Sequence, residues 1–300
     1  MFSRRHPFLF FYLVFASIVA VTVLGSSLLI YLGARHTDYG TSLTDGEDKV
    51  GVIEVTGVIA EAKETIFWLK QFREEDSIKA IVIRIDSPGG VVGPSQEIYR
   101  EIQKTNKVKK VIASMGAIAA SGGYYIAAGA DGIVANPGTI TGSIGVIIGY
   151  TNFKALLDKI GLTPVVIKSG EFKDIGSPSR EMTAEERQVL QAFVNQTHHQ
   201  FITAIAEGRN MDLGRVTELA DGRIYTGQEA KGLGLIDRLG NLEDAIEWAG
   251  QLGGIEGKVE TFYPPPERLS WITYLMESSL NTVIDKLTTR ELIGGFIYNP

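Results

Sequence analysis

A serine set among small residues is the first candidate for chemistry in this 300-residue chain. Ser121 lies within Met115-Gly-Ala-Ile-Ala-Ala-Ser-Gly-Gly-Tyr-Tyr125, after a predicted strand and at the start of a predicted apolar helix. We expect an exposed Oγ there, at the positive end of the helix dipole. The N–H of Gly122 can then face an oxygen on the carbon that the serine attacks. The alternative is a helix N-cap serine, which only satisfies backbone N–H groups.

A second glycine-bearing turn can supply another part of an acyl-transfer site. Asp86-Ser-Pro-Gly-Gly90 follows a predicted strand and precedes a predicted helix, at the sheet edge where open α/β folds bind ligands. Gly89 and Gly90 leave backbone N–H groups unobstructed, which an oxyanion hole requires. The same residues also suit an ordinary strand-to-helix turn.

A serine nucleophile needs a base, and histidine is scarce in this chain. Beyond residue 49 there are only His198 and His199, which are adjacent on a predicted helix and follow no strand end, so a Ser-His-Asp triad is disfavoured. A lysine can replace histidine, because burial lowers the pKa of its ammonium towards neutrality. The best candidate is Lys173, in a loop after a predicted strand from Val165 to Ile167. Lys168 in the same loop is its competitor, and either lysine can also be a solvated surface charge.

A third small-residue turn, Thr139-Ile-Thr-Gly-Ser143-Ile-Gly-Val146, places another hydroxyl between these segments. A hydroxyl such as that of Ser143 can orient a neutral lysine amine, although a tight turn in a glycine-rich core explains the sequence equally well. No phosphate loop, no dinucleotide fingerprint and no metal-ligand spacing is present, so the sequence implies neither a cofactor nor a metal.

The elements that would position these residues alternate between strand and helix. Short β-branched runs begin at Val50, Ala80 and Val111, and each is followed by a stretch with helical spacing. Strands this apolar are covered on both faces, which predicts an α/β fold with a mainly parallel sheet. Further on, Thr183-Ala-Glu-Glu186 is a capping box that predicts the start of a long helix.

The first 35 residues differ from the rest, because Phe8 to Leu32 is uncharged, strongly apolar and long enough to cross about 30 Å of hydrocarbon. Arg4 and Arg5 precede this segment, so the positive-inside bias predicts a cytoplasmic N-terminus and an external domain. The rival interpretation is a cleaved signal peptide, but the apolar run exceeds the usual length of about 7–15 residues. We interpret residues 36–49 as a polar linker.

Overall composition narrows the function further. The net charge of −6 and the pI near 5.4 make nucleic acid an improbable partner. The absence of cysteine excludes disulfides and a thiol nucleophile. We divide the chain into an anchor at 1–35, the linker at 36–49, a catalytic domain at 50–262 and an amphipathic tail at 263–300, whose apolar side chains could pack on a neighbouring subunit or on lipid.

Four ordered motifs resemble the signal peptide peptidase A family, membrane-bound bacterial serine proteases that share the fold of Clp protease and the crotonases. These motifs are Asp86-Ser-Pro-Gly-Gly90, Ala120-Ser-Gly-Gly-Tyr-Tyr125, Thr141-Gly-Ser-Ile-Gly145 and Ser169-Gly-Glu-Phe-Lys-Asp174. The resemblance covers about residues 50–252 and contains a single copy of the family's repeated unit, so the chain looks like the short form.

The resemblance implies a role for each candidate residue. It makes Ser121 the nucleophile, Lys173 the general base, Ser143 the residue that orients the lysine, and Gly90 and Gly122 the backbone donors of the oxyanion hole. It also implies an octameric ring in which serine and lysine come from neighbouring chains, located at the inner cell membrane with the catalytic domain in the periplasm or outside the cell. The expected substrates are signal peptide remnants and other membrane-associated peptides. A crotonase-type thioester enzyme and a non-catalytic membrane scaffold are the competing hypotheses.

Overall fold

The computed structural model describes residues 47–265 and 295–297, together with isolated positions between residues 8 and 25 that are helical. Contacts divide the chain into two units, residues 1–45 and residues 46–300. Most of the predicted membrane span at 8–32, and most of the predicted tail at 263–300, lie outside the described residues. In the part of the chain that is described, no helix combines the length and apolarity needed to cross a bilayer.

A mainly parallel sheet forms the centre of the second unit. Its strands are β1 Lys49–Thr56, β2 Ile78–Ser87, β4 Lys110–Ala120, β5 Gly132–Ala135, β6 Ile140–Gly142, β7 Ile224–Thr226, β8 Arg238–Leu239 and β9 Glu260–Phe262. Within the described residues the order is β7-β6-β4-β2-β1-β9, with β5 paired to β4 and β8 paired to β5. Only β6 and β7 pair antiparallel in this sheet. The predicted α/β class with a mainly parallel sheet is confirmed.

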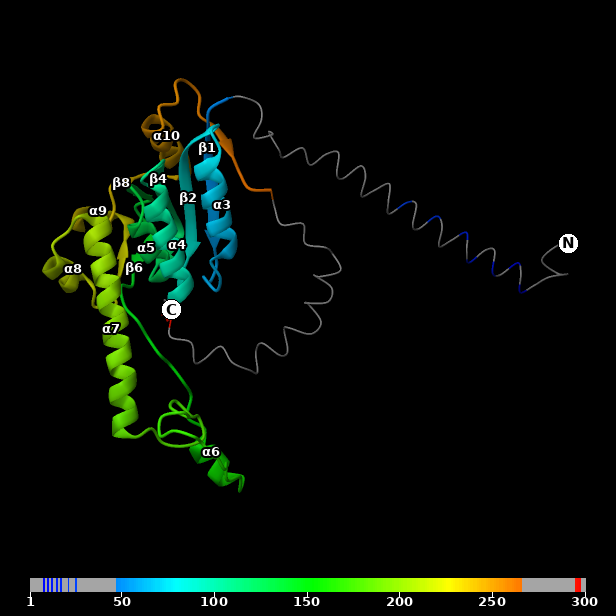
Figure 1. The fold of residues 1–300 in the computed structure, drawn as a ribbon, viewed down its shortest axis with the longest axis vertical. Coiled ribbons are helices and arrows are strands. Elements are labelled where there is room, and N and C mark those ends of the chain that lie inside the picture. Colours follow the sequence, from blue (N-terminus) through cyan, green and yellow to red (C-terminus); the bar gives the residue numbers. More distant parts are fainter. Residues whose placement is uncertain are drawn as a thin grey trace. The chain divides into compact units, whose positions relative to one another are not determined.

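Helices cover both faces of the sheet (Figure 1). They are α3 Lys63–Glu74, α4 Val92–Thr105, α5 Gly122–Ala128, α6 Lys154–Lys159, α7 Ala184–Arg209, α8 Leu213–Leu219, α9 Gly227–Leu233 and α10 Leu242–Leu252. Successive side chains of a strand point to opposite faces. On β1, Gly51 faces Phe72 of α3, whereas Val50 and Val52 face α10. Because both faces are buried, these strands carry nearly continuous apolar runs.

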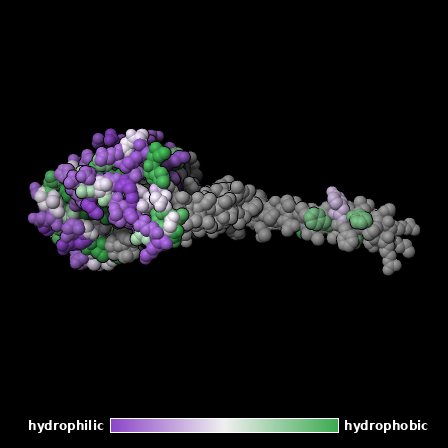
Figure 2. All heavy atoms as spheres, turned by 90° about the horizontal axis from the view of Figure 1, so that it is seen from below, coloured by the Kyte–Doolittle hydropathy of each residue, from purple (hydrophilic) through white to green (hydrophobic). Residues whose placement is uncertain are grey.

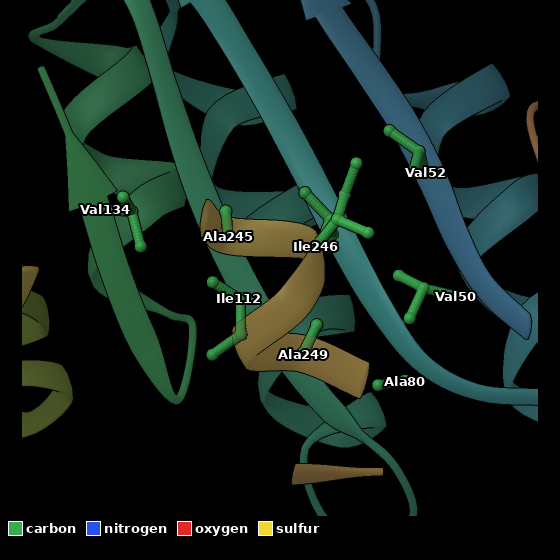
Figure 3. Close-up of a cluster of buried hydrophobic side chains, with 9 residues drawn as sticks. Val50, Val52, Ala80, Ile112, Val134, Ala245, Ile246 and Ala249 are labelled. Carbon is green, nitrogen blue, oxygen red and sulfur yellow. The ribbon is translucent and has the colours of Figure 1, made fainter. Parts of the chain in front are cut away.

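The core between the sheet and α10 is made of small and β-branched side chains (Figure 3). Its members come from four neighbouring strands and one helix: Val50, Val52, Ala80, Val82, Ile112, Val134, Ala245, Ile246 and Ala249. Each is at most 3% exposed. This packing fixes the central strands, and the candidate residues follow at the ends of those strands.

The strand β4 changes partner along its length and ends at the candidate nucleophile. Residues 112–115 pair with β5, whereas residues 118–120 pair with β6. Its neighbour β2 pairs with it in parallel, so both strands run to the same edge of the sheet. The two glycine-bearing turns that follow β2 and β4 therefore meet there, as predicted from the sequence.

A short strand stands apart from the main sheet at this edge. This strand, β3 at Gly89–Val91, pairs antiparallel with β10 at Gly295–Ile297, near the C-terminus. On its other side, β3 bridges to Ile59. The backbone of Gly90 therefore lies in a segment that accepts an extended, antiparallel chain.

Residues 148–182 form an arm between β6 and α7, carrying α6 at its far end (Figure 1). The predicted strand from Val165 to Ile167 is wrong, because these residues form no strand and Ile167 is 97% exposed. In the part of the chain that the structure describes, no strand pairs with them to accept their backbone hydrogen bonds. Exposed large apolar side chains on the arm include Leu156, Ile160, Leu162, Val165, Val166 and Phe172. Figure 2 looks onto the α6 end of the molecule and shows hydrophobic residues among hydrophilic ones.

Candidate active site

Ser121 joins β4 to α5 in a backbone conformation that L-residues rarely adopt. Its φ is 54° and its ψ is −118°, and its side chain makes no capping hydrogen bond to α5. The backbone is held on both sides, because its N–H donates to the Gly142 carbonyl (2.8 Å) and its carbonyl accepts from Tyr125 (2.8 Å). Such a conformation costs about 1–3 kcal/mol and persists only where the surroundings impose it. The turn is therefore a strained strand-to-helix elbow, and Ser121 is not an ordinary N-cap.

The expected exposure of the Ser121 Oγ is wrong for the single chain. Ser121 is only 1% exposed. The physical reason is that every residue of α5 is buried, so the start of this helix lies beneath the segments around it. The hydroxyl therefore sits in a largely dry environment, where electrostatic interactions are stronger than in water.

The two glycines proposed as oxyanion donors lie against each other. A Cβ built on Gly122 would stand 3.2 Å from the backbone nitrogen of Gly90 and 2.6 Å from the Oγ of Ser95. A side chain at either glycine is therefore excluded by close neighbours: a Cβ on Gly90 would lie 2.2 Å from the Ile59 carbonyl oxygen. The structure brings Gly90, Gly122 and Ser121 together at one edge of the sheet.

We predict that Gly90→Ala lowers kcat for peptide hydrolysis by about 10²–10³-fold, the effect of losing one oxyanion donor. The added methyl group overlaps Ile59, so β3 must shift and take its backbone N–H with it. Gly93→Ala is the matched control, because a Cβ there meets open space. Steady-state kinetics with both variants measure the effect. Equal, undiminished activity would show that the Gly90 backbone has no catalytic role.

Ser143 lies beside Ser121 because β6 runs next to β4. The pairing of Ala120 with Gly142 places the following residues of the two strands side by side. Ser143 is 8% exposed with a φ of 49°, and its N–H donates to the Arg223 carbonyl (2.8 Å). A second strained, buried serine thus adjoins the first, as the position of a lysine-orienting hydroxyl requires.

Neither predicted lysine lies at Ser121 in the single chain. Lys173 and Lys168 are both on the arm, and Lys173 is exposed to solvent. The Nζ of Lys168 donates to the Glu171 carbonyl (2.7 Å) and to the Asp174 carboxylate (2.6 Å). Lys168 therefore tethers the loop, whereas Lys173 is exposed on it.

Positions along α7 indicate how far the loop of Lys173 lies from the turn at Ser121. Gln200 of α7 accepts a hydrogen bond from Gln96 (2.9 Å), the residue after the Ser95 that contacts Gly122. Gln200 therefore marks the level of the Ser121 turn along α7. The loop of Lys173 is attached near Glu186, 14 residues earlier, which is about 20 Å at 1.5 Å per residue. Proton transfer needs contact at about 3 Å.

The two histidines lie on α7, as predicted, and neither hydrogen-bonds Ser121 among the described residues. The Nε2 atom of His198 is buried and has no hydrogen-bond partner within them. Among the described residues there is therefore no Ser-His pair of the kind that activates a serine in a triad.

Sequence reasoning missed two residues that shape the site. The carboxylate of Asp86 accepts the N–H of Ile118 (3.1 Å) and so fixes β4 shortly before Ser121. Ser95 packs its Oγ on Gly122 and donates to the Val91 carbonyl (3.0 Å), which ties the start of α4 to β3. Asp86 stands in a recognised motif, but nothing in the sequence distinguishes Ser95 from other helix serines.

Comparison with known proteins gives two family matches. A model described as Peptidase family S49 matches residues 103–256, and one described as Clp protease matches residues 51–139. A Synechocystis sp. protein named "Putative protease slr0021" is 46% identical over 252 residues, which cover 83% of this chain and 91% of that protein. The Enterococcus faecium protein "Putative signal peptide peptidase SppA" is 38% identical, over 75% of this chain and 70% of its own length. The Arabidopsis thaliana protein "Serine protease SPPA, chloroplastic" is 36% identical over 75% of this chain and 35% of its own.

Proposed function

This chain belongs to peptidase family S49 and is a serine protease, and we propose that it is a membrane-anchored endopeptidase working through a Ser121-Lys173 dyad. The observation that carries the proposal is the strained elbow at Ser121, with the backbones of Gly122 and Gly90 against it. In the reaction, the Lys173 amine takes the proton of the Ser121 hydroxyl as Oγ attacks the peptide carbonyl. The proton then passes to the leaving amine, and a water activated by Lys173 hydrolyses the acyl-enzyme.

We propose that the dyad is shared between subunits of a ring. Two features support this: Lys173 is exposed on an arm about 20 Å along α7 from the level of Ser121, and the arm carries exposed apolar side chains suited to burial against another chain. A head-to-tail contact places each arm on the next subunit and closes into a ring. The octamer stays the expected size.

We propose that the substrate binds as an extended strand against β3. The pairing of β10 with β3 supports this, because it shows that the backbone at Gly90 accepts an antiparallel chain. Apolar side chains near residues 91–94 and 144–148, of which Ile147 is exposed, would favour apolar or small substrate side chains. Signal peptide remnants and other membrane-associated peptides have this character, and the Enterococcus faecium relative is named for such substrates.

The location of the enzyme follows from the proposed anchor. Residues 8–32 would hold it in the inner cell membrane by contact with lipid, with the N-terminus in the cytoplasm and the catalytic domain in the periplasm or outside the cell. The polar linker at 36–49 would separate the domain from the bilayer. An active site held near the membrane surface would be accessible to peptides that remain in the bilayer, and the proposed substrates are peptides of this kind.

A phosphonylating probe tests the identity of the nucleophile. We expect the probe to label the native protein on Ser121, because only a serine with an activated hydroxyl reacts readily with it. Mass spectrometry of the labelled peptide locates the adduct, and heat-denatured protein and Ser121→Ala are the controls that should stay unlabelled. Absence of labelling would favour a non-catalytic scaffold, and turnover of an acyl-thioester without labelling would favour the crotonase-type alternative.

A further inference from the structure

The loop that carries Lys173 is held by one arginine. Arg180 donates from Nε to the Asp174 carboxylate (2.9 Å) and from Nη2 to the Asp174 carbonyl (3.2 Å). Its Nη1 donates to the Glu186 carboxylate (2.8 Å), and its Nη2 bonds the same carboxylate. A planar guanidinium can join two carboxylates in this way, whereas the single ammonium of a lysine cannot reproduce the fork.

One end of this network lies next to the proposed base. Asp174 follows Lys173 directly in the chain, and it receives Arg180 on one oxygen and Lys168 on the other. The pKa of the Asp174 carboxyl is lowered, first by the hydrogen bond from Arg180 and then by that from Lys168. Both side-chain oxygens and the backbone carbonyl of Asp174 are bound, so the residue that follows Lys173 is held in place.

The other end of the network is the first turn of α7. Glu186 accepts the backbone N–H of Thr183 (2.9 Å), and its own N–H donates to the Thr183 hydroxyl (3.1 Å), completing the predicted capping box. Glu186 is 2% exposed. The Arg180 guanidinium beside it lowers the pKa of this carboxyl to about 2. The arginine thus joins the loop to a buried, ionised cap of a regular helix.

The far half of α7 is packed into the body of the protein. Phe201 is fully buried, and its ring lies 4.8 Å from that of Tyr125 in α5. At Gly208 the helix approaches the Ala128 carbonyl so closely that a Cβ would lie 1.9 Å from it. Since α5 begins directly after Ser121, α7 is a stiff connection between the catalytic domain and the clamped loop.

We propose that Arg180 is a positioning residue that clamps the Lys173 loop to α7, so that each arm presents its lysine at a fixed place to the serine of the next subunit. The inference rests on the proposed Ser121-Lys173 mechanism. Arg180 contacts neither reacting group; it acts through the backbone of Asp174. The charged groups at 168, 174, 180 and 186 form one connected set, here named the clamp.

Kinetics of Arg180 variants test the clamp. We expect Arg180→Ala to lower kcat by about 10- to 100-fold, with a smaller change in KM. The reason is that displacing a catalytic group by about 1 Å can lower the reaction rate by up to about 100-fold. Arg180→Lys keeps the positive charge but cannot bind both carboxylates at once, so its kcat should lie between those of the wild type and Arg180→Ala. Added guanidinium should partly restore Arg180→Ala. Arg215→Ala, which removes an exposed arginine paired with Glu218, is the matched control and should keep full activity.

Mixed oligomers show on which chain the arginine acts. The lysine donor is a Ser121→Ala chain, and the serine donor is a Lys173→Ala chain. Adding Arg180→Ala to the lysine donor should reduce the activity recovered on mixing, whereas adding it to the serine donor should not. A merely structural role predicts equal loss from both chains. Thermal melting and size-exclusion chromatography check that each variant folds and assembles. If Arg180→Ala does not fold or assemble, Arg180→Lys replaces it in the mixing experiment.

The outcomes separate the clamp from the dyad. Wild-type kcat in Arg180→Ala, together with an inactive Lys173→Ala, would overturn the clamp and leave the lysine mechanism standing. Equal loss from both donor chains would also overturn the clamp. Full activity of Lys173→Ala would overturn the lysine mechanism itself, and the clamp with it.

Discussion

Ser121→Ala is expected to lower kcat/KM for a peptide substrate by at least about 10⁴-fold, because removing the nucleophile leaves only binding and the oxyanion hole. The strained elbow and the adjoining glycine backbones should remain, so substrate binding should change little. Steady-state kinetics and a direct binding measurement separate the two effects. An Ser121→Ala enzyme with substantial turnover would refute the assignment of the nucleophile.

The backbone strain at Ser121 allows a control that separates loss of activity from loss of folding. Glycine adopts a φ of 54° without the steric cost that alanine has there. Ser121→Gly should therefore be more stable than Ser121→Ala by about 1 kcal/mol, and equally inactive. Denaturant unfolding of the two variants measures the difference. An inactive but more stable variant shows that the conformation serves the reaction and not the stability of the fold.

Mixing two inactive variants is expected to restore activity. Ser121→Ala chains retain the lysine and Lys173→Ala chains retain the serine, so a subunit boundary between the two kinds can assemble a complete dyad. In a randomly mixed ring with equal amounts of each, about one quarter of the sites combine a serine from one chain with a lysine from the next. Recovery close to that fraction of wild-type activity is the expected result, measured after co-expression or joint refolding.

Two comparisons make the mixing experiment decisive. Ser121→Ala mixed with a chain carrying both substitutions should stay inactive, because no serine is present. Each single variant alone should stay inactive at every protein concentration. If the mixture shows no recovery while mass spectrometry finds mixed oligomers, the dyad is not shared, and the position of Lys173 in the single chain must change during catalysis instead.

The fold class and the order of the chemical groups could be predicted from the sequence because they depend on local patterns. Buried parallel strands require apolar runs, and the runs at Val50, Ala80 and Val111 became β1, β2 and β4. The capping box at Thr183 needs only residues within one turn, and it formed as predicted. The glycine-bearing turns were identified because glycine leaves backbone N–H groups unobstructed, and the family resemblance singled out Gly90 and Gly122, where the structure leaves no room for a Cβ.

Other features depended on packing between distant segments. The apolar residues from Val165 to Ile167 have a strand-like composition, but no strand among the described residues pairs with them, and they stay exposed on the arm. The burial of Ser121 could not be predicted either, because it arises where the whole of α5 is enclosed. In the same way, no local pattern links Arg180 to both Asp174 and Glu186.

The sequence by itself determined the mainly parallel α/β architecture and the small-residue turns, because residue type and short spacing suffice for these. The pairing of Ser121 with Lys173, which the family resemblance singled out, stays a prediction. Only the tertiary structure decided where the groups lie. It set Ser121 in a strained, buried elbow beside Gly90 and Gly122, and it placed Lys173 on an exposed arm that precedes the start of α7. Distances between segments follow from packing and helix length, which the order of residues along a chain does not show.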